Sequence, residues 1–301
     1  SGNSTDAFLD DTSYHSVTVD EISTLRIYEN DGSFEDLSLQ VITKDADGNL
    51  IKDADGKPII QAATDTSTLM VGGADGERLI GGGGDDQVAG VGGDDVLIGG
   101  AGDDFLDGGA GSDTVSFEDA KETVNIDLSA SSAAGVETGN DFISVENVLG
   151  GAGDDVIKGD ASNNILDGGA GNDQFVGTGG SDTIIGGAGE DTLSYGDENT
   201  ALTVDMAAGT VTGVGTDNIS GIEKVVTGSG NDVLKGSVGD DIFDGGGGDD
   251  AFHISGGDDT IITGGGSDTL HVGAGYSIVS IALNEESGAL TFALNKISDS
   301  S

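Results

Sequence analysis

From Gly72 onward, large apolar residues recur at every ninth position in a stretch otherwise rich in glycine and acidic residues. The column of apolar residues begins at Leu79 and ends at Leu270. We count fifteen copies of this nine-residue unit, and its eighth position is apolar in all of them. Each apolar residue lies in a short segment of alternating character, so the pattern predicts one short strand per unit.

Two polar columns keep the same phase as the apolar one. The fourth position is Gly in thirteen of fifteen copies, with Asp75 and Ser162 as exceptions. The sixth position is Asp in thirteen copies, with Glu77 and Asn164 as exceptions. Glycine at the first, second and fourth positions allows the backbone to turn sharply through positive φ. A flexible glycine-rich linker carries no apolar period, so the pattern argues against a linker.

These columns predict a solenoid. A turn, a strand, a second turn and a second strand make one coil of 18 residues, and units two apart then stack at the strand spacing of about 4.8 Å. The eighth-position side chains point inward and form a narrow apolar core, which a single coil cannot bury. The predicted fold is an all-β, right-handed parallel β-roll (a β-helix) with short β segments as caps.

The units form three blocks of five, separated by two similar spacers. Glu77, Asp155 and Asp232 are equivalent positions, spaced 78 and 77 residues apart. The spacers share the related segments TVNIDLSAS and ALTVDMAAG, and later SVENVL and GIEKVV. The predicted divisions are an N-terminal β segment or cap at 1–71, a first block at 72–116, a spacer at 117–149, a second block at 150–194, a spacer at 195–226, a third block at 227–271 and a C-terminal cap at 272–301.

The sixth-position carboxylates require a cation. Stacking places Asp86 over Asp104 and Asp95 over Asp113, and carboxylates this close repel one another. The chain has 56 acidic and 10 basic residues, a net charge of −46. Ca²⁺ accepts six to eight carboxylate and carbonyl oxygens in flexible geometry, whereas Mg²⁺ demands a tighter octahedral shell. Zinc prefers His or Cys. Without cations such a chain is expected to be disordered, so metal binding supplies folding free energy.

The unit GGAGDDFLD at Gly99–Asp107 matches the signature G-G-x-G-x-D-x-U-x, and over residues 72–271 the chain resembles the repeats-in-toxin (RTX) family. The resemblance implies calcium ligands from sixth-position side chains and loop-glycine carbonyls. The expected ligands are Asp86, Asp95, Asp104, Asp113, Asp155, Asn164, Asp173, Asp182, Asp191, Asp232, Asp241, Asp250, Asp259 and Asp268, with Gly100, Gly102, Gly109, Gly111, Gly169, Gly171, Gly187, Gly189, Gly246 and Gly248. Stacked pairs suggest about nine or more ions. Departures from the signature at Gly72–Ile80 and Gly159–Asp167 predict weaker or absent sites there.

The resemblance also implies a role in secretion. RTX proteins leave Gram-negative bacteria unfolded through the type I secretion apparatus, so we expect a secreted or cell-surface protein that folds on calcium outside the cell. An adhesin or toxin is the expected parent, with a cell-surface or matrix target contacted through an upstream region. Residues 272–301 fit a capping strand pair and a type I export signal equally well. Two alternatives stay open: the C-terminal module of an exoenzyme (lipase, protease or epimerase), and a ligand-binding solenoid surface.

Other functions are disfavoured by the sequence. The chain has no G-x-S-x-G or H-E-x-x-H motif and no cysteine, so no catalytic residue is expected within it. The acidic charge disfavours nucleic-acid binding, no apolar run is long enough to span a membrane, and a monomer is expected. His253 and His271 are expected to stack on adjacent coils facing solvent, with a transition-metal site as the alternative. The tandem Lys44–Ile51 and Lys52–Ile59 is read as turns, with calcium binding as the alternative.

Overall fold

The computed structural model describes residues 25–28, 34–37, 52, 56–61, 67–274, 276–283 and 290–296. Over these residues the chain forms β-strands, turns and one short 3-10 helix, η1 (Leu128–Ala130), without an α-helix. The all-β prediction is therefore confirmed. His15 and the first half of the Asp-Gly tandem lie outside the described residues.

The chain divides into two compact units. The first comprises Ser1–Phe117 with Ser131–Asn147, and the second Glu118–Ala130 with Val148–Ser301. The strands of the first unit are β1 (Leu25–Tyr28), β2 (Phe34–Leu37), β3 (Ile59–Gln61), β4 (Leu69–Val71), β5 (Arg78–Gly83), β6 (Gln87–Gly92), β7 (Val96–Ala101), β8 (Phe105–Ala110), β9 (Thr114–Ser116), β11 (Ser132–Gly135) and β12 (Gly139–Ser144).

The strands of the second unit are shorter in its repeat blocks and longer at its C-terminal end. They are β10 (Val124–Asp127), β13 (Asn147–Leu149), β14 (Val156–Lys158), β15 (Ile165–Asp167), β16 (Gln174–Val176), β17 (Thr183–Ile185), β18 (Thr192–Ser194), β19 (Thr203–Asp205), β20 (Thr210–Thr212), β21 (Thr216–Ser220), β22 (Lys224–Val226), β23 (Val233–Lys235), β24 (Ile242–Asp244), β25 (Ala251–Ile254), β26 (Asp258–Ile262), β27 (Thr269–Val272), β28 (Tyr276–Leu283) and β29 (Leu290–Lys296).

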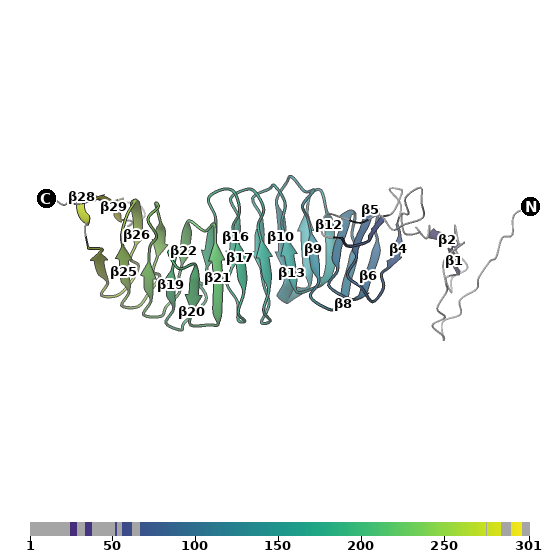
Figure 1. The fold of residues 1–301 in the computed structure, drawn as a ribbon, viewed down its shortest axis with the longest axis horizontal. Coiled ribbons are helices and arrows are strands. Elements are labelled where there is room, and N and C mark those ends of the chain that lie inside the picture. The colour runs from purple at the N-terminus through teal and green to yellow at the C-terminus, as the bar shows by residue number, and fades with distance from the viewer. Residues whose placement is uncertain are drawn as a thin grey trace, which may run out of the picture. The chain divides into compact units, whose positions relative to one another are not determined.

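In the first unit, alternate strands pair in parallel. One layer runs β3-β5-β7-β9 and the other β4-β6-β8-β12. Leu79 lies opposite Leu97, and Val88 lies opposite Leu106, so the register advances by 18 residues per coil. Figure 1 shows these strands side by side and joined by loops at both edges. The predicted coil of two strands and two turns is thereby confirmed.

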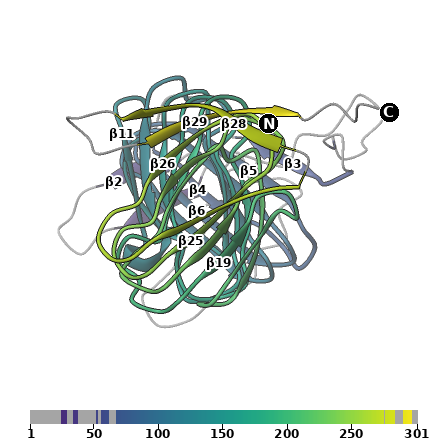
Figure 2. The same ribbon diagram turned by 90° about the vertical axis from the view of Figure 1, so that its left-hand side faces the viewer.

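In the second unit the same parallel stacking continues. One layer runs β10-β14-β16-β18-β22-β24-β26. The other contains the parallel runs β13-β15-β17-β21 and β19-β23-β25-β27. At the C-terminal end β29 pairs antiparallel with both β26 and β28, and Figure 2 shows β28 and β29 beside β26. This strand pair is the predicted cap.

The apolar column forms the core. Fourteen of the fifteen eighth-position side chains are buried, from Leu79 and Val88 to Phe252 and Ile261. Leu270, on the last coil, is only partly buried. Alternation within each short strand places the flanking seventh and ninth positions outside the core.

The spacers are more than extra coils. Each adds an antiparallel strand: β11 pairs with β12 in the first unit, and β20 lies between β19 and β21 in the second. Since this strand reverses direction, the distance between stacked partners rises from 18 to 35 residues or more, as between Ile184 and Ile219. The expectation of plain spacer coils was therefore incomplete, because the sequence pattern gave no sign of a strand reversal.

Candidate metal centres

The sixth-position carboxylates lie buried beneath the turns at both edges of the coils. Asp95, Asp173 and Asp191 have no exposed surface, and only Asp268, on the last coil, is partly exposed. Burial of so many carboxylates is costly unless each is hydrogen-bonded and balanced by positive charge. The two oxygens of each carboxylate therefore have to be accounted for separately.

One carboxylate oxygen holds the preceding coil. The backbone N–H of Asp86 donates to Oδ1 of Asp104 over 2.8 Å, and the N–H of Asp95 donates to Oδ1 of Asp113 over 2.8 Å. The same bond joins Asp155 to Asp173 and continues through the later blocks. We call this series the carboxylate ladder. It confirms the predicted stacking of sixth-position residues 18 apart.

The other oxygen has no hydrogen-bond partner in ten of these residues. The buried, unpartnered Oδ2 atoms belong to Asp86, Asp95, Asp104, Asp113, Asp173, Asp182, Asp191, Asp232, Asp250 and Asp259. Buried polar atoms in proteins nearly always have a partner, and exceptions point to a bound ion or water. Ten equivalent exceptions on one ladder fit a repeated cation site.

Backbone carbonyls approach the same places. A Cβ placed on Gly81 would lie 2.4 Å from Oδ2 of Asp86 and 2.6 Å from the carbonyl oxygen of Gly99. On Gly90 it would lie 2.2 Å from Oδ2 of Asp95. The first-position glycine thus keeps a small space open between a carboxylate oxygen and a carbonyl oxygen one coil further on. Calcium takes such oxygens at about 2.3–2.6 Å, so the residues fit this ion.

The predicted glycine ligands occupy the turns themselves. All ten have positive φ, from 70° at Gly246 to 152° at Gly111. Positive φ is readily adopted by glycine and strained for most other residues. The carbonyl of Gly169 accepts the N–H of Ala188 over 3.0 Å, and a carbonyl oxygen has two lone pairs. Their ligand role stays a prediction. The first-position carbonyls beside the Oδ2 atoms were missed.

Four loops close on themselves. In each, the second-position backbone N–H donates to the sixth-position side chain of the same loop: Gly73 to Glu77 (3.0 Å), Gly151 to Asp155 (2.9 Å), Asp160 to Asn164 (2.9 Å) and Ser237 to Asp241 (2.7 Å). This N–H satisfies the oxygen that is unpartnered elsewhere. Two of these loops are those where the signature departs, Gly72–Ile80 and Gly159–Asp167. The closed loops support the prediction of weaker sites there.

A second ladder, which the sequence analysis missed, joins the fifth positions. The N–H of Asp103 donates to Oδ1 of Asp85 over 3.0 Å, and the N–H of Asn172 donates to Oδ1 of Asp154 over 2.7 Å. These bonds are exposed and run in the opposite sense to those of the carboxylate ladder. The signal was available, since the fifth position is polar in fourteen of the fifteen copies.

The spacers also contribute acidic side chains to the carboxylate ladder. The N–H groups of ladder residues in the blocks donate to Asp141, Glu146, Asp217 and Glu223. Asp141 and Asp217 lie in the segments GNDFI and GTDNI, which keep the fourth, sixth and eighth positions of the unit but lack its leading glycines. The sequence analysis therefore overlooked two incomplete repeats.

Burial disfavours the charged form of these carboxylates. It raises the pKa of Asp86, Asp95, Asp104, Asp173, Asp182 and Asp250 from 3.8 to about 6, and that of Asp141 and Asp259 to about 7. Ladder N–H donors oppose the shift, and neighbouring carboxylates add to it. A nearby cation would favour the charged form instead.

Backbone oxygens are required to complete a site. Among the described residues, no three His, Cys, Asp or Glu side chains converge on one point. Each ion would therefore be held by carboxylates together with carbonyls, as calcium accepts. The rings of His253 and His271 stack with centroids 4.5 Å apart, as predicted, without a third side chain of this kind beside them.

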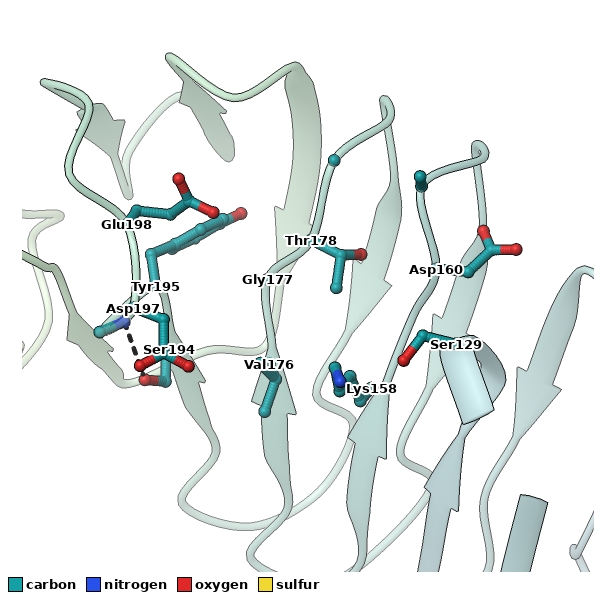
Figure 3. A pocket seen from close by; sticks show the side chains of 13 residues that line it. Ser129, Lys158, Asp160, Val176, Gly177, Thr178, Ser194, Tyr195, Asp197 and Glu198 are labelled. Atoms are coloured by element: carbon teal, nitrogen blue, oxygen red, sulfur yellow. Dashed lines mark hydrogen bonds between the residues drawn. The ribbon is translucent and has the colours of Figure 1, made fainter. Parts of the chain in front are cut away.

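The second unit contains an open pocket of about 480 Å³ (Figure 3). Ser129, Lys158, Thr178, Tyr195 and Glu198 are among its lining residues. The ammonium of Lys158 forms an ion pair with Asp127 over 3.3 Å. These polar groups are not arranged as a nucleophile with its base, so we assign no catalytic role to the pocket.

Stacked parallel coils with buried carboxylates at both edges define a calcium-binding β-roll. The RTX calcium-binding nonapeptide repeat family matches residues 71–90, 80–115, 139–175, 167–200, 213–252 and 255–279, which together exceed half of the chain. The chain belongs to this family. Comparison with curated proteins gives no match. RTX repeats form a structural calcium-binding region, in agreement with the prediction that the repeats carry no catalytic residue.

Proposed function

We propose that this chain folds when calcium binds its carboxylate ladders outside the cell, and that this folding serves the secretion of a type I-exported adhesin or toxin. The observation that carries the proposal is the set of ten buried Oδ2 atoms without a partner. Each one adjoins a glycine turn and lacks a counter-charge. Calcium supplies that charge and uses the carbonyls of the same turns.

The energetics favour a switch. Extracellular calcium modules have dissociation constants of about 10⁻⁴ to 10⁻³ M. At about 100 times its dissociation constant, each ion adds about 2.7 kcal/mol to the stability of the folded state. Several sites acting together stabilise the roll outside the cell, while low calcium leaves net charge −46 to oppose folding.

Export in the unfolded state requires that the chain stay soluble and avoid the membrane. The described part of the chain has no helix of the length and apolarity needed to cross a bilayer. A secreted or cell-surface location outside a Gram-negative bacterium follows from the proposal. The type I secretion apparatus is then the partner during export.

The experiment is a calcium titration followed by far-UV circular dichroism, starting in chelator, with magnesium as the control ion. We expect a cooperative coil-to-β transition near millimolar calcium and none with magnesium. A chain already folded in chelator would reject the switch and favour a static ligand-binding surface. A catalytic motif encoded upstream would instead favour an exoenzyme module with the same calcium transition.

A further inference from the structure

Two spacer carboxylates extend the ladder at equivalent places in the duplicated chain. The N–H of Asp104 donates to Oδ1 of Asp141 over 3.0 Å, and the N–H of Asp182 donates to Oδ1 of Asp217 over 2.9 Å. All four side chains are buried. The two pairs form an internal comparison, since the ladder geometry is shared and only the surroundings differ.

At the first pair the space beside the ladder is open. Asp104 is 3% exposed, and its Oδ2 has no hydrogen-bond partner. A Cβ on Gly99, the first residue of the same loop, would lie 2.1 Å from that oxygen, and its three nearest atoms all belong to Asp104. Asp141 brings a second buried carboxylate one coil further on. Two carboxylates side by side without a counter-charge repel strongly.

At the second pair a tyrosine takes the same place. The hydroxyl of Tyr195 donates to Oδ2 of Asp217 over 2.5 Å, and the residue is 1% exposed. A Cβ on Gly177 would lie 2.1 Å from ring atom Cε1 of Tyr195. Figure 3 shows the Tyr195 side chain directed toward the strand segment at Gly177 and Thr178. The ring therefore fills the space that is open beside Gly99.

The first copy has a natural phenylalanine at the matching position. Phe117 follows the first block as Tyr195 follows the second. Phe117 has no hydroxyl to donate to a carboxylate, and its ring is not among the nearest neighbours of Gly99. The hydroxyl bond to Asp217 thus explains why the tyrosine ring lies over its glycine.

We propose that Asp104 and Asp141 hold a further calcium ion, and that Tyr195 closes the equivalent place at Asp182 and Asp217. This inference rests on the proposed function, in which the ladder binds calcium. The tyrosine O–H is a neutral donor that satisfies one oxygen of Asp217 without an ion. Burial raises the pKa of Tyr195, so the hydroxyl stays protonated at neutral pH. The second unit is held at this point without calcium.

The test counts bound calcium ions by native mass spectrometry of the full chain at saturating calcium. Asp141→Asn keeps an oxygen for the N–H of Asp104 and removes the charge, so it is expected to bind one ion fewer than the wild type. Asp217→Asn is the matched control and is expected to leave the count unchanged. Tyr195→Phe is expected to gain one ion, and adding Asp217→Asn to it is expected to remove that gain.

The outcomes separate the two proposals. A wild type that binds no calcium overturns the proposed function. A wild type that binds several ions, with Asp141→Asn at the same count, overturns only the site at Asp104 and Asp141. An unchanged count in Tyr195→Phe overturns the closing role of the hydroxyl. Circular dichroism in calcium establishes that each variant is folded before its ions are counted.

Discussion

Adding one methyl group to the roll tests the calcium sites directly. Gly168 is the first residue of its loop, and a Cβ there would lie 2.2 Å from Oδ2 of Asp173 and 2.8 Å from the carbonyl oxygen of Gly186. Gly168 does not have positive φ, so Gly168→Ala places the new methyl group between these two oxygens without straining the backbone. We expect the variant to lose the ion that they would share.

The magnitude follows from the number of ions. Loss of one ion removes about 2.7 kcal/mol of stability when calcium is about 100 times the dissociation constant. Each tenfold rise in calcium stabilises the fold by about 1.4 kcal/mol per bound ion. The stability of Gly168→Ala should therefore rise less steeply with calcium, by about 1.4 kcal/mol per tenfold change. Steric strain alone lowers stability by the same amount at every calcium concentration.

The assay is urea unfolding, followed by circular dichroism, at a series of calcium concentrations that keep the protein folded. Gly179→Ala is the matched control, because a Cβ at Gly179 meets no atom within 4 Å. The control should keep the wild-type calcium dependence. A constant loss of stability in Gly168→Ala, equal at low and high calcium, would refute an ion between Asp173 and Gly186.

Three further predictions follow from the ladder and the turns. Asp250→Asn should raise the calcium concentration at half-folding more than Asp241→Asn does, because Oδ2 of Asp250 has no donor whereas that of Asp241 accepts the N–H of Ser237; equal midpoints by circular dichroism would contradict this. In chelator, β structure should increase as the pH falls from 7 toward 4, because protonation favours the fold below the raised pKa of about 6 at Asp86 and about 7 at Asp259. Its gain on raising the pH through that range would be inconsistent with the buried carboxylates, and saturating calcium should suppress the dependence. Val91→Gly should raise stability in calcium by about 1 kcal/mol, since Val91 has φ 79° and is 54% exposed; a lower melting temperature would count against strain there.

Much of this architecture was predictable because the repeat writes each role at a fixed position. The eighth-position column gave the core, and the 18-residue coil gave the stacking of Asp86 over Asp104. Which carboxylates keep an unpartnered oxygen was less accessible. Asp155 and Asp173 look alike in sequence, but the N–H of Gly151 turns toward Asp155 and closes its loop. That difference depends on the orientation of one peptide, which the signature does not encode.

The spacers limited the prediction most. Their antiparallel strands β11 and β20 change the distance between stacked partners, so Asp141 and Asp217 fall outside a strict 18-residue count. The leading glycines that mark a unit are also missing from GNDFI and GTDNI. Tyr195 was counted only as a spacer residue, because its contact with Asp217 depends on how the spacer folds back.

The two ladders give the roll a polarity. In the buried ladder each coil's N–H is capped by the coil after it, as Asp86 is by Asp104. In the exposed ladder it is capped by the coil before it, as Asp103 is by Asp85. A chain shortened from its C-terminal side loses caps in the interior, where water cannot replace them. Shortening from the N-terminal side uncovers groups that water can reach. The two ends are therefore unequal, and truncation from the C-terminal side is the more damaging.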